Sequence, residues 1–149
     1  MIEQRPDSLS QQTTNQSASG RIHLLHKITQ GDLDILCLVL CHRLVRRDQL
    51  RLLTERHPKR LHRRLLVLGR NGYLTVIRQP PHAHIYGLAK GALPVLAEEG
   101  IASPDLVNHR FRTTELKPLF LKHEMMIVDV HVAITLACRA KNVALIDWQ

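Results

Sequence analysis

A dense group of lysine and arginine side chains is the feature of this 149-residue sequence best suited to chemistry. Between residues 43 and 70, ten basic residues stand against two acidic ones, so this window alone carries +8, the net charge of the whole chain. A solvated surface normally mixes both signs, whereas a concentrated basic patch is the electrostatic signature of a protein that binds a polyanion. The window therefore predicts contacts with the phosphates of a nucleic acid.

The histidines and cysteines are the other candidates for chemistry, as metal ligands or catalytic groups. Cys37 and Cys41 have a spacing that can support a metal, but they lie in the most apolar stretch of the chain, where free cysteine acts as a small core residue. His123-Glu124 lacks the second histidine of a zinc-protease helix. The sequence contains no nucleophile elbow and no glycine-rich phosphate loop. We expect no enzyme, no catalytic residue, no metal and no cofactor.

Three helices are expected to position the basic residues. The first begins at the N-cap Thr29 and continues through the apolar stretch LDILCLVLCHRLV until Arg46 and Arg47 end it. The second opens at Asp48 and stops before Pro58, because a residue that precedes proline is disfavoured in a helix. Pro58 then begins a third helix, which the glycines at 69 and 72 bring to an end.

The third helix presents two different faces. Leu61, Leu65 and Leu68 form a buried stripe, and at 100° per residue Lys59 and Arg63 point away from it. Two strand-like runs, 73–79 and 84–89, follow and form a hairpin. The predicted fold is mainly α with a small β-hairpin wing, a winged helix-turn-helix whose third helix enters the major groove. The predicted DNA-binding residues are Arg46, Arg47, Arg51, Lys59, Arg60, Arg63, Arg64, Arg70, Arg78, His82 and His84.

The remaining segments complete the predicted domain organisation. Residues 1–20 form a disordered polar tail, and 21–100 form the winged helix-turn-helix domain, which closes with a helix at 90–99 kinked at Pro94. Residues 101–118 form a linker. Residues 119–149 form the longest helix, up to Ala140, and a terminal strand, 143–148. This helix has two apolar stripes, so we expect a homodimer across it. The predicted dimerisation residues are Leu121, Met125, Val128 and Val132, and the second stripe is Met126, Val130, Ile134 and Ala137.

Three segments resemble the replication-relaxation family, which are winged-helix DNA-binding proteins of plasmids and other mobile elements. They read RRLLVLGRNGYLTVI, IYGLAKGALPVLAEEG and LKHEMMIVDVHVAITLACRAKNVALIDW, and the resemblance covers residues 30 to 149. It implies that His123, Asp129 and Trp148 are shared positions, without assigning them a role. Relatives usually continue beyond such a strand, so 119–149 is either a dimerisation element or the start of a second domain.

The expected function is sequence-specific binding of double-stranded DNA by a dimeric transcriptional or replication regulator in the cytoplasm. The sequence shows neither a secretory signal nor an apolar run long enough for a membrane. Alternatives are an accessory of a relaxase or nuclease whose catalytic part lies in or beyond the C-terminal segment, a regulator with a small-molecule effector, and a module that grips an acidic protein.

Overall fold

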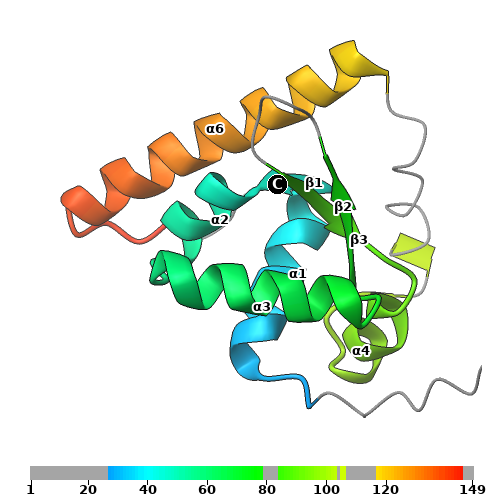
Figure 1. Cartoon of the computed structure of the whole chain (residues 1–149). Coiled ribbons are helices and arrows are strands. Elements are labelled where there is room, and N and C mark those ends of the chain that lie inside the picture. Colours follow the sequence, from blue (N-terminus) through cyan, green and yellow to red (C-terminus); the bar gives the residue numbers. More distant parts are fainter. Residues whose placement is uncertain (1–26, 79–83, 104, 107–116, 146–149) are drawn as a thin grey trace, which may run out of the picture.

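The computed structural model describes residues 27–78, 84–103, 105–106 and 117–145 (Figure 1). It is mainly helical, with one small antiparallel sheet and a long C-terminal helix, which confirms the predicted fold class. The elements are α1 (Gln30–His42), β1 (Leu44–Arg46), α2 (Arg47–Thr54), α3 (Pro58–Arg70), β2 (Leu74–Ile77), β3 (Ile85–Leu88), α4 (Ala92–Glu98) and α6 (Pro118–Ala140). Within these ranges, no helix has the length and apolar character needed to cross a membrane.

The first helix ends three residues earlier than the sequence predicted. α1 stops at His42, and Arg43 turns the chain with a left-handed φ of 65°. Leu44 and Val45, expected to be helical, instead belong to β1, which pairs antiparallel with β3 and gives the sheet order β1-β3-β2. Both side chains are fully buried. The hairpin is therefore part of a three-stranded sheet.

The start of α2 also differs from the prediction. Arg46, and not Asp48, is the N-cap, and Asp48 lies in the first turn. The Gln49 side chain accepts a hydrogen bond from the Arg46 backbone N–H at 2.8 Å, as the third residue of a capping box does. α2 therefore follows β1 without a loop.

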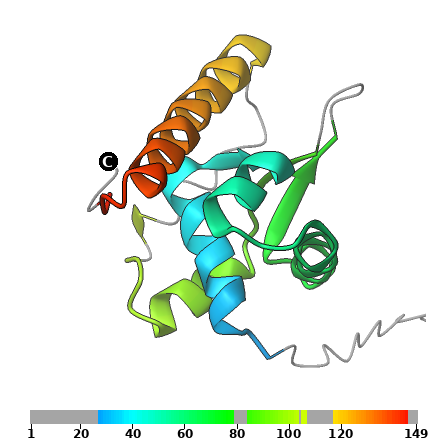
Figure 2. The same cartoon turned by 90° about the vertical axis from the view of Figure 1, so that its left-hand side faces the viewer.

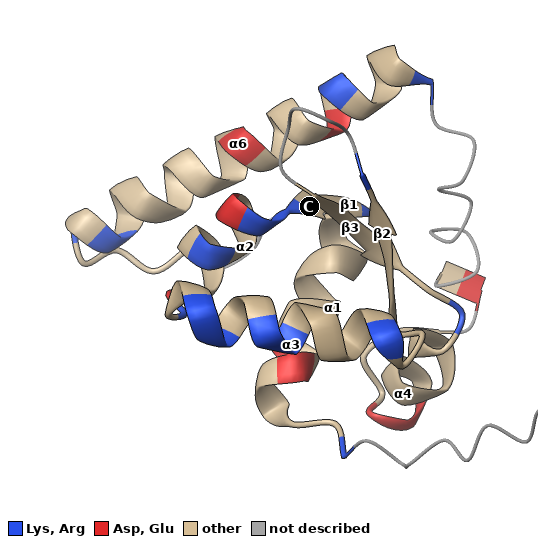
Figure 3. Cartoon of the chain, in the orientation of Figure 1, with Lys and Arg blue, Asp and Glu red and all other residues tan. Residues whose placement is uncertain are grey.

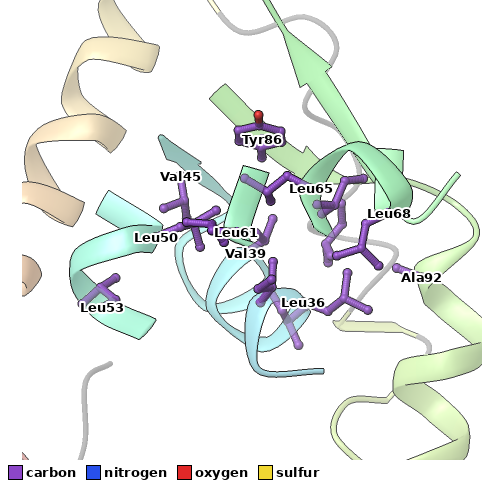
Figure 4. Close-up of a cluster of buried hydrophobic side chains, with 14 of the residues drawn as sticks. Leu36, Val39, Val45, Leu50, Leu53, Leu61, Leu65, Leu68, Tyr86 and Ala92 are labelled. Carbon is purple, nitrogen blue, oxygen red and sulfur yellow. The ribbon is translucent and has the colours of Figure 1, made fainter. Parts of the chain in front are cut away.

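The leucine stripe of α3 is buried, as predicted, and α2 and α3 both pack on α1. Leu61, Leu65 and Leu68 of α3 are each at most 1% exposed, and Leu50 of α2 is fully buried beside them. Figure 4 shows these side chains converging on Leu36 of α1 in one cluster. This packing leaves the opposite face of α3 in solvent.

The position of Pro94 in α4 differs from the prediction. Pro94 is the third residue of α4, where a backbone N–H has no intrahelical partner, so it belongs to the first turn and not to a kinked interior.

The expected C-terminal strand is absent from the part of it that the structure describes. Residues 143–145 form no strand, and the rest of the expected strand, with Trp148, lies outside the described residues. The polar tail, 1–20, and most of the linker, 107–116, also lie outside them.

The stripe of α6 that was assigned to dimerisation is buried within the single chain. Val128 and Val132 pack into the main core, while Leu121 and Met125 pack against Leu44 and neighbours of the sheet. All four α6 side chains are at most 7% exposed. This assignment was wrong, because β1 and α2 cover that face of the helix. Figures 1 and 2 show α6 on the side of α2 opposite α3.

Candidate nucleic-acid interface

The outer face of α3 is a row of exposed basic side chains. Lys59, Arg60, Arg63 and Arg70 are all exposed, and Figure 3 shows the basic residues along the length of this helix. None of them takes part in the ion pairs found among the described residues. These four cations are therefore available to a ligand.

A hollow of about 420 Å³ lies between α2 and the start of α3. Its charged lining consists of Arg47, Arg51 and Lys59 against one carboxylate, that of Asp48. The Arg47 guanidinium lies 3.4 Å from Nδ1 of His62 at this hollow. Because cations outnumber the single carboxylate and the positive end of the α3 dipole lies at the same place, the hollow favours an anion.

Arg64 does not belong to this surface, in contrast to the prediction. Its guanidinium binds the carboxylate of Asp32 on α1, with Nε 2.8 Å from Oδ1 and Nη2 in contact with Oδ2. Asp32 is fully buried and also accepts bonds from the backbone N–H and hydroxyl of Thr29, at 2.9 and 2.7 Å. Burial favours a higher pKa for Asp32, but the bonds from Arg64 and Thr29 outweigh it and hold the pKa below 3.8. Arg64 therefore anchors α3 to α1.

Arg46 is likewise used inside the protein. Its guanidinium pairs with Asp129 of α6 at 2.7 Å and with Asp48 at 3.2 Å, and its side chain is only 26% exposed. The predicted contact of Arg46 with DNA is corrected to a tie between α2 and α6.

The hairpin carries the remaining predicted residues. Arg78 directly follows β2 and His84 directly precedes β3, and both are exposed. His82 lies outside the described residues. The wing therefore places one arginine and one histidine at the same end of the sheet.

Two further residues, which the sequence analysis missed, hold α2 against α6. The amide of Gln49, 1% exposed, donates to Asp129 at 2.7 Å and to the Met125 carbonyl at 3.2 Å. At the other end of α2, Arg139 donates to the carbonyls of Leu52 and Leu53, both at 2.7 Å. The glutamine three residues after Arg46 was a visible capping signal, whereas nothing local in the sequence indicates Arg139.

The histidines and cysteines that were candidates for chemistry differ in burial. His42 and His131 are buried, and Nε2 of His42 lies 2.6 Å from Nδ1 of His131. Burial raises the pKa of the Cys37 thiol, whereas Cys41 is exposed and is not the core residue we expected. Among the described residues, no cluster of three or more histidines, cysteines and carboxylates is arranged to hold a metal.

Comparison with known proteins gives one match. The family model described as replication-relaxation matches residues 36–149, well over half of the chain. No curated protein and no solved structure matches it significantly. The matched range includes all of α2, α3, the sheet and α6.

Proposed function

The chain belongs to the replication-relaxation family, and from this premise we propose that it binds duplex DNA with sequence preference, as a regulator of transcription or replication on a mobile genetic element. The observation that carries the proposal is the outer face of α3, where Lys59, Arg60, Arg63 and Arg70 are exposed and unpaired within the described part of the chain. A row of cations on a helix that follows a short helix and precedes a hairpin is the arrangement of a helix-turn-helix reader.

The dimensions of α3 support insertion into the major groove. Its 13 residues give a length of roughly 20 Å, and the groove is about 12 Å wide and admits an α-helix. Lys59, Arg60 and Arg63 lie in the first two turns, where readers of this class contact bases. Arg63 is the best candidate for a base contact, since an arginine can bond a guanine with two hydrogen bonds.

The cations around α2 have a different expected role. Arg47 and Arg51 line the hollow beside the start of α3, so they would hold a backbone phosphate while α3 lies in the groove. Arg78 and His84 would contact the neighbouring backbone from the wing. Phosphate contacts fix register and carry no sequence information of their own.

Fluorescence anisotropy with labelled duplexes tests the proposal. The protein is titrated against the DNA that flanks its own gene and against a random duplex of equal length, at several salt concentrations. We expect tighter binding to the flanking DNA. Each phosphate contact adds about 0.9 to the salt slope. The six exposed cations other than Arg63, which are Arg47, Arg51, Lys59, Arg60, Arg70 and Arg78, would therefore give a slope of about −5 per chain if all of them contact phosphates.

Single substitutions separate base contacts from phosphate contacts. Arg63→Ala should cost about 1–3 kcal/mol on the preferred duplex and reduce the preference for it. Arg51→Ala should weaken binding to both duplexes alike and lower the salt slope by about one. Lys122→Ala is the matched control, because Lys122 is an exposed cation on α6, on the far side of α2 from α3. The proposal is contradicted if Arg63→Ala and Arg51→Ala both keep the affinity of the unaltered protein. It is also contradicted if the unaltered protein binds both duplexes with equal affinity.

A further inference from the structure

The outer face of α6 is apolar where a surface helix is normally polar. The side chains that point away from the core fall within about 60° of Val130 around the helix axis, and all are exposed. This outer stripe consists of Leu119, His123, Met126, Ile127, Val130, Ala133, Ile134 and Ala137. It contains no lysine, arginine or carboxylate, and Figure 3 shows only a few blue or red segments along α6. The helix is therefore apolar on the face opposite its core contacts.

The stripe is large enough to form an interface. Its large apolar residues are from 38% exposed, at Ile134, to 80%, at Leu119, and together they present on the order of 400–500 Å² of apolar surface, near the upper end for a monomer. Beside its first turns lies a hollow of about 590 Å³, lined by Leu119, Phe120 and Met126 and also by Lys117, Lys122 and His123. Two such surfaces facing each other would bury about 1,000 Å², the size at which specific interfaces begin.

No segment of this sequence outside the described residues matches the stripe in length and character. Residues 1–20 are dominated by Gln, Ser, Thr and Asn. Residues 107–116 include two arginines, a histidine and a glutamate, and 146–149 are four residues facing a stripe of five helical turns. Residues 21–26 include Ile22, Leu24 and Leu25, and residues 79–83 include two prolines, but both segments are too short for a stripe of five turns. α6 itself has an apolar face of matching length, so the surface is complementary to a second copy.

We propose that two copies of the chain dimerise through the outer stripe, with their α6 helices antiparallel and crossing at Val130. The stripe is bulky in its first half and small in its second. The antiparallel arrangement places Ile127 opposite Ala133 of the second copy and His123 opposite its Ala137, so in these pairs a large side chain meets a small one. Met126 then faces Ile134 of the second copy, and Val130 faces Val130. A parallel arrangement would set bulky against bulky and leave alanine against alanine.

The dimer would fix the spacing of the two α3 helices. Asp129 and Arg139 tie α6 to both ends of α2, through the bonds to Arg46, Gln49 and the Leu52 and Leu53 carbonyls. Because these bonds hold α6 against α2, a two-fold axis at Val130 would also fix how the two DNA-facing surfaces are placed relative to each other. A dimer with two-fold symmetry would bind a palindromic DNA site. This consequence rests on the proposed function, whereas the dimer itself does not.

Sedimentation equilibrium without DNA tests the dimer. We expect the unaltered protein at micromolar concentration to have twice the 17.1 kDa mass of the chain. Val130→Glu should raise the dissociation constant at least tenfold while the circular dichroism spectrum stays unchanged, because Val130 faces solvent. Ile101→Glu is the control, since Ile101 is an exposed apolar residue outside α6. A monomeric unaltered protein, or a dimer indifferent to Val130→Glu, would overturn the proposal whatever the protein does with DNA.

Cross-linking tests the orientation. In a variant whose Cys37, Cys41 and Cys138 are replaced by alanine, Val130→Cys should cross-link to its counterpart with a short bifunctional maleimide. Ala137→Cys should not, because antiparallel helices crossing at Val130 hold its two copies about 21 Å apart along the axis. Cross-linking at both positions would show a parallel pair and would overturn the arrangement.

Discussion

Replacing Arg64 with alanine should destabilise the fold by about 3 kcal/mol without removing a DNA contact. Asp32 is 0% exposed, and the Arg64 guanidinium is its counter-ion. Removing one partner of a buried ion pair typically costs about 3–5 kcal/mol, because the other charge stays buried and uncompensated. The Arg64 side chain is 27% exposed, and Thr29 still donates two hydrogen bonds to Asp32, so the lower end of that range applies.

The loss of stability caused by Arg64→Ala should become smaller as the pH falls. In the unaltered protein the pKa of Asp32 is held below 3.8. Its contribution to the free energy of unfolding is therefore complete above that value and is lost as the pH falls through the lowered pKa. Without Arg64, burial acts with less opposition and raises this pKa relative to that in the unaltered protein. The carboxyl of the variant then takes up a proton at a higher pH than that of the unaltered protein, which removes the buried charge. The difference in the free energy of unfolding between the two proteins should therefore shrink as the pH falls from 7 through the raised pKa.

Urea unfolding followed by circular dichroism measures both effects. A loss of about 3 kcal/mol lowers the midpoint by roughly 1–2 M urea. Arg60→Ala, an exposed arginine on the same helix, is the matched control and should change stability by at most about 0.5 kcal/mol. The reasoning fails if Arg64→Ala costs under about 1 kcal/mol, or if its cost does not shrink as the pH is lowered from 7 to the most acidic pH at which both proteins are still folded.

Two other polar contacts of α6 give predictions for stability. Asp129→Ala should lower the free energy of unfolding by about 1–2 kcal/mol, because it leaves the buried Gln49 amide with one acceptor fewer and Arg46 without its closer carboxylate; a urea midpoint that does not move would contradict this. Burial lowers the pKa of His131 below 6.5, so the unfolded chain takes up this proton first and stability should fall as the pH drops below 6.5. His131→Leu should flatten that fall between pH 7.5 and pH 5.5, and an equally steep loss in the variant would show that the burial of His131 is not responsible.

The helices that sequence reasoning located correctly are those defined by neighbouring residues. α3 begins at Pro58 and buries leucines at helical spacing, and both signals lie within its own 13 residues. β1 was missed because its residues continue an apolar run in which periodicity cannot separate strand from helix. What makes Leu44–Arg46 a strand is β3, about forty residues further along the chain.

The buried face of α6 could not be chosen from its sequence. The Leu121 stripe and the Met126 stripe are both apolar and both continue over several turns, so composition ranks them equally. Packing decides between them, since Leu44 of the unexpected β1 and Ile85 of β3 cover Leu121 and Met125. The error in the predicted dimerisation residues therefore follows directly from the missed strand.

Neighbouring arginines on α3 show why a count of charges locates a binding surface only approximately. Arg63 and Arg64 are adjacent and chemically identical, but a rotation of 100° about the helix axis separates their side chains. That rotation leaves Arg63 in solvent and brings Arg64 to Asp32, thirty-two residues earlier in the chain. Arg46 is removed from the surface in the same way by Asp129. The basic window therefore serves two purposes, since part of its charge holds α2 and α3 in place and only the remainder faces outward.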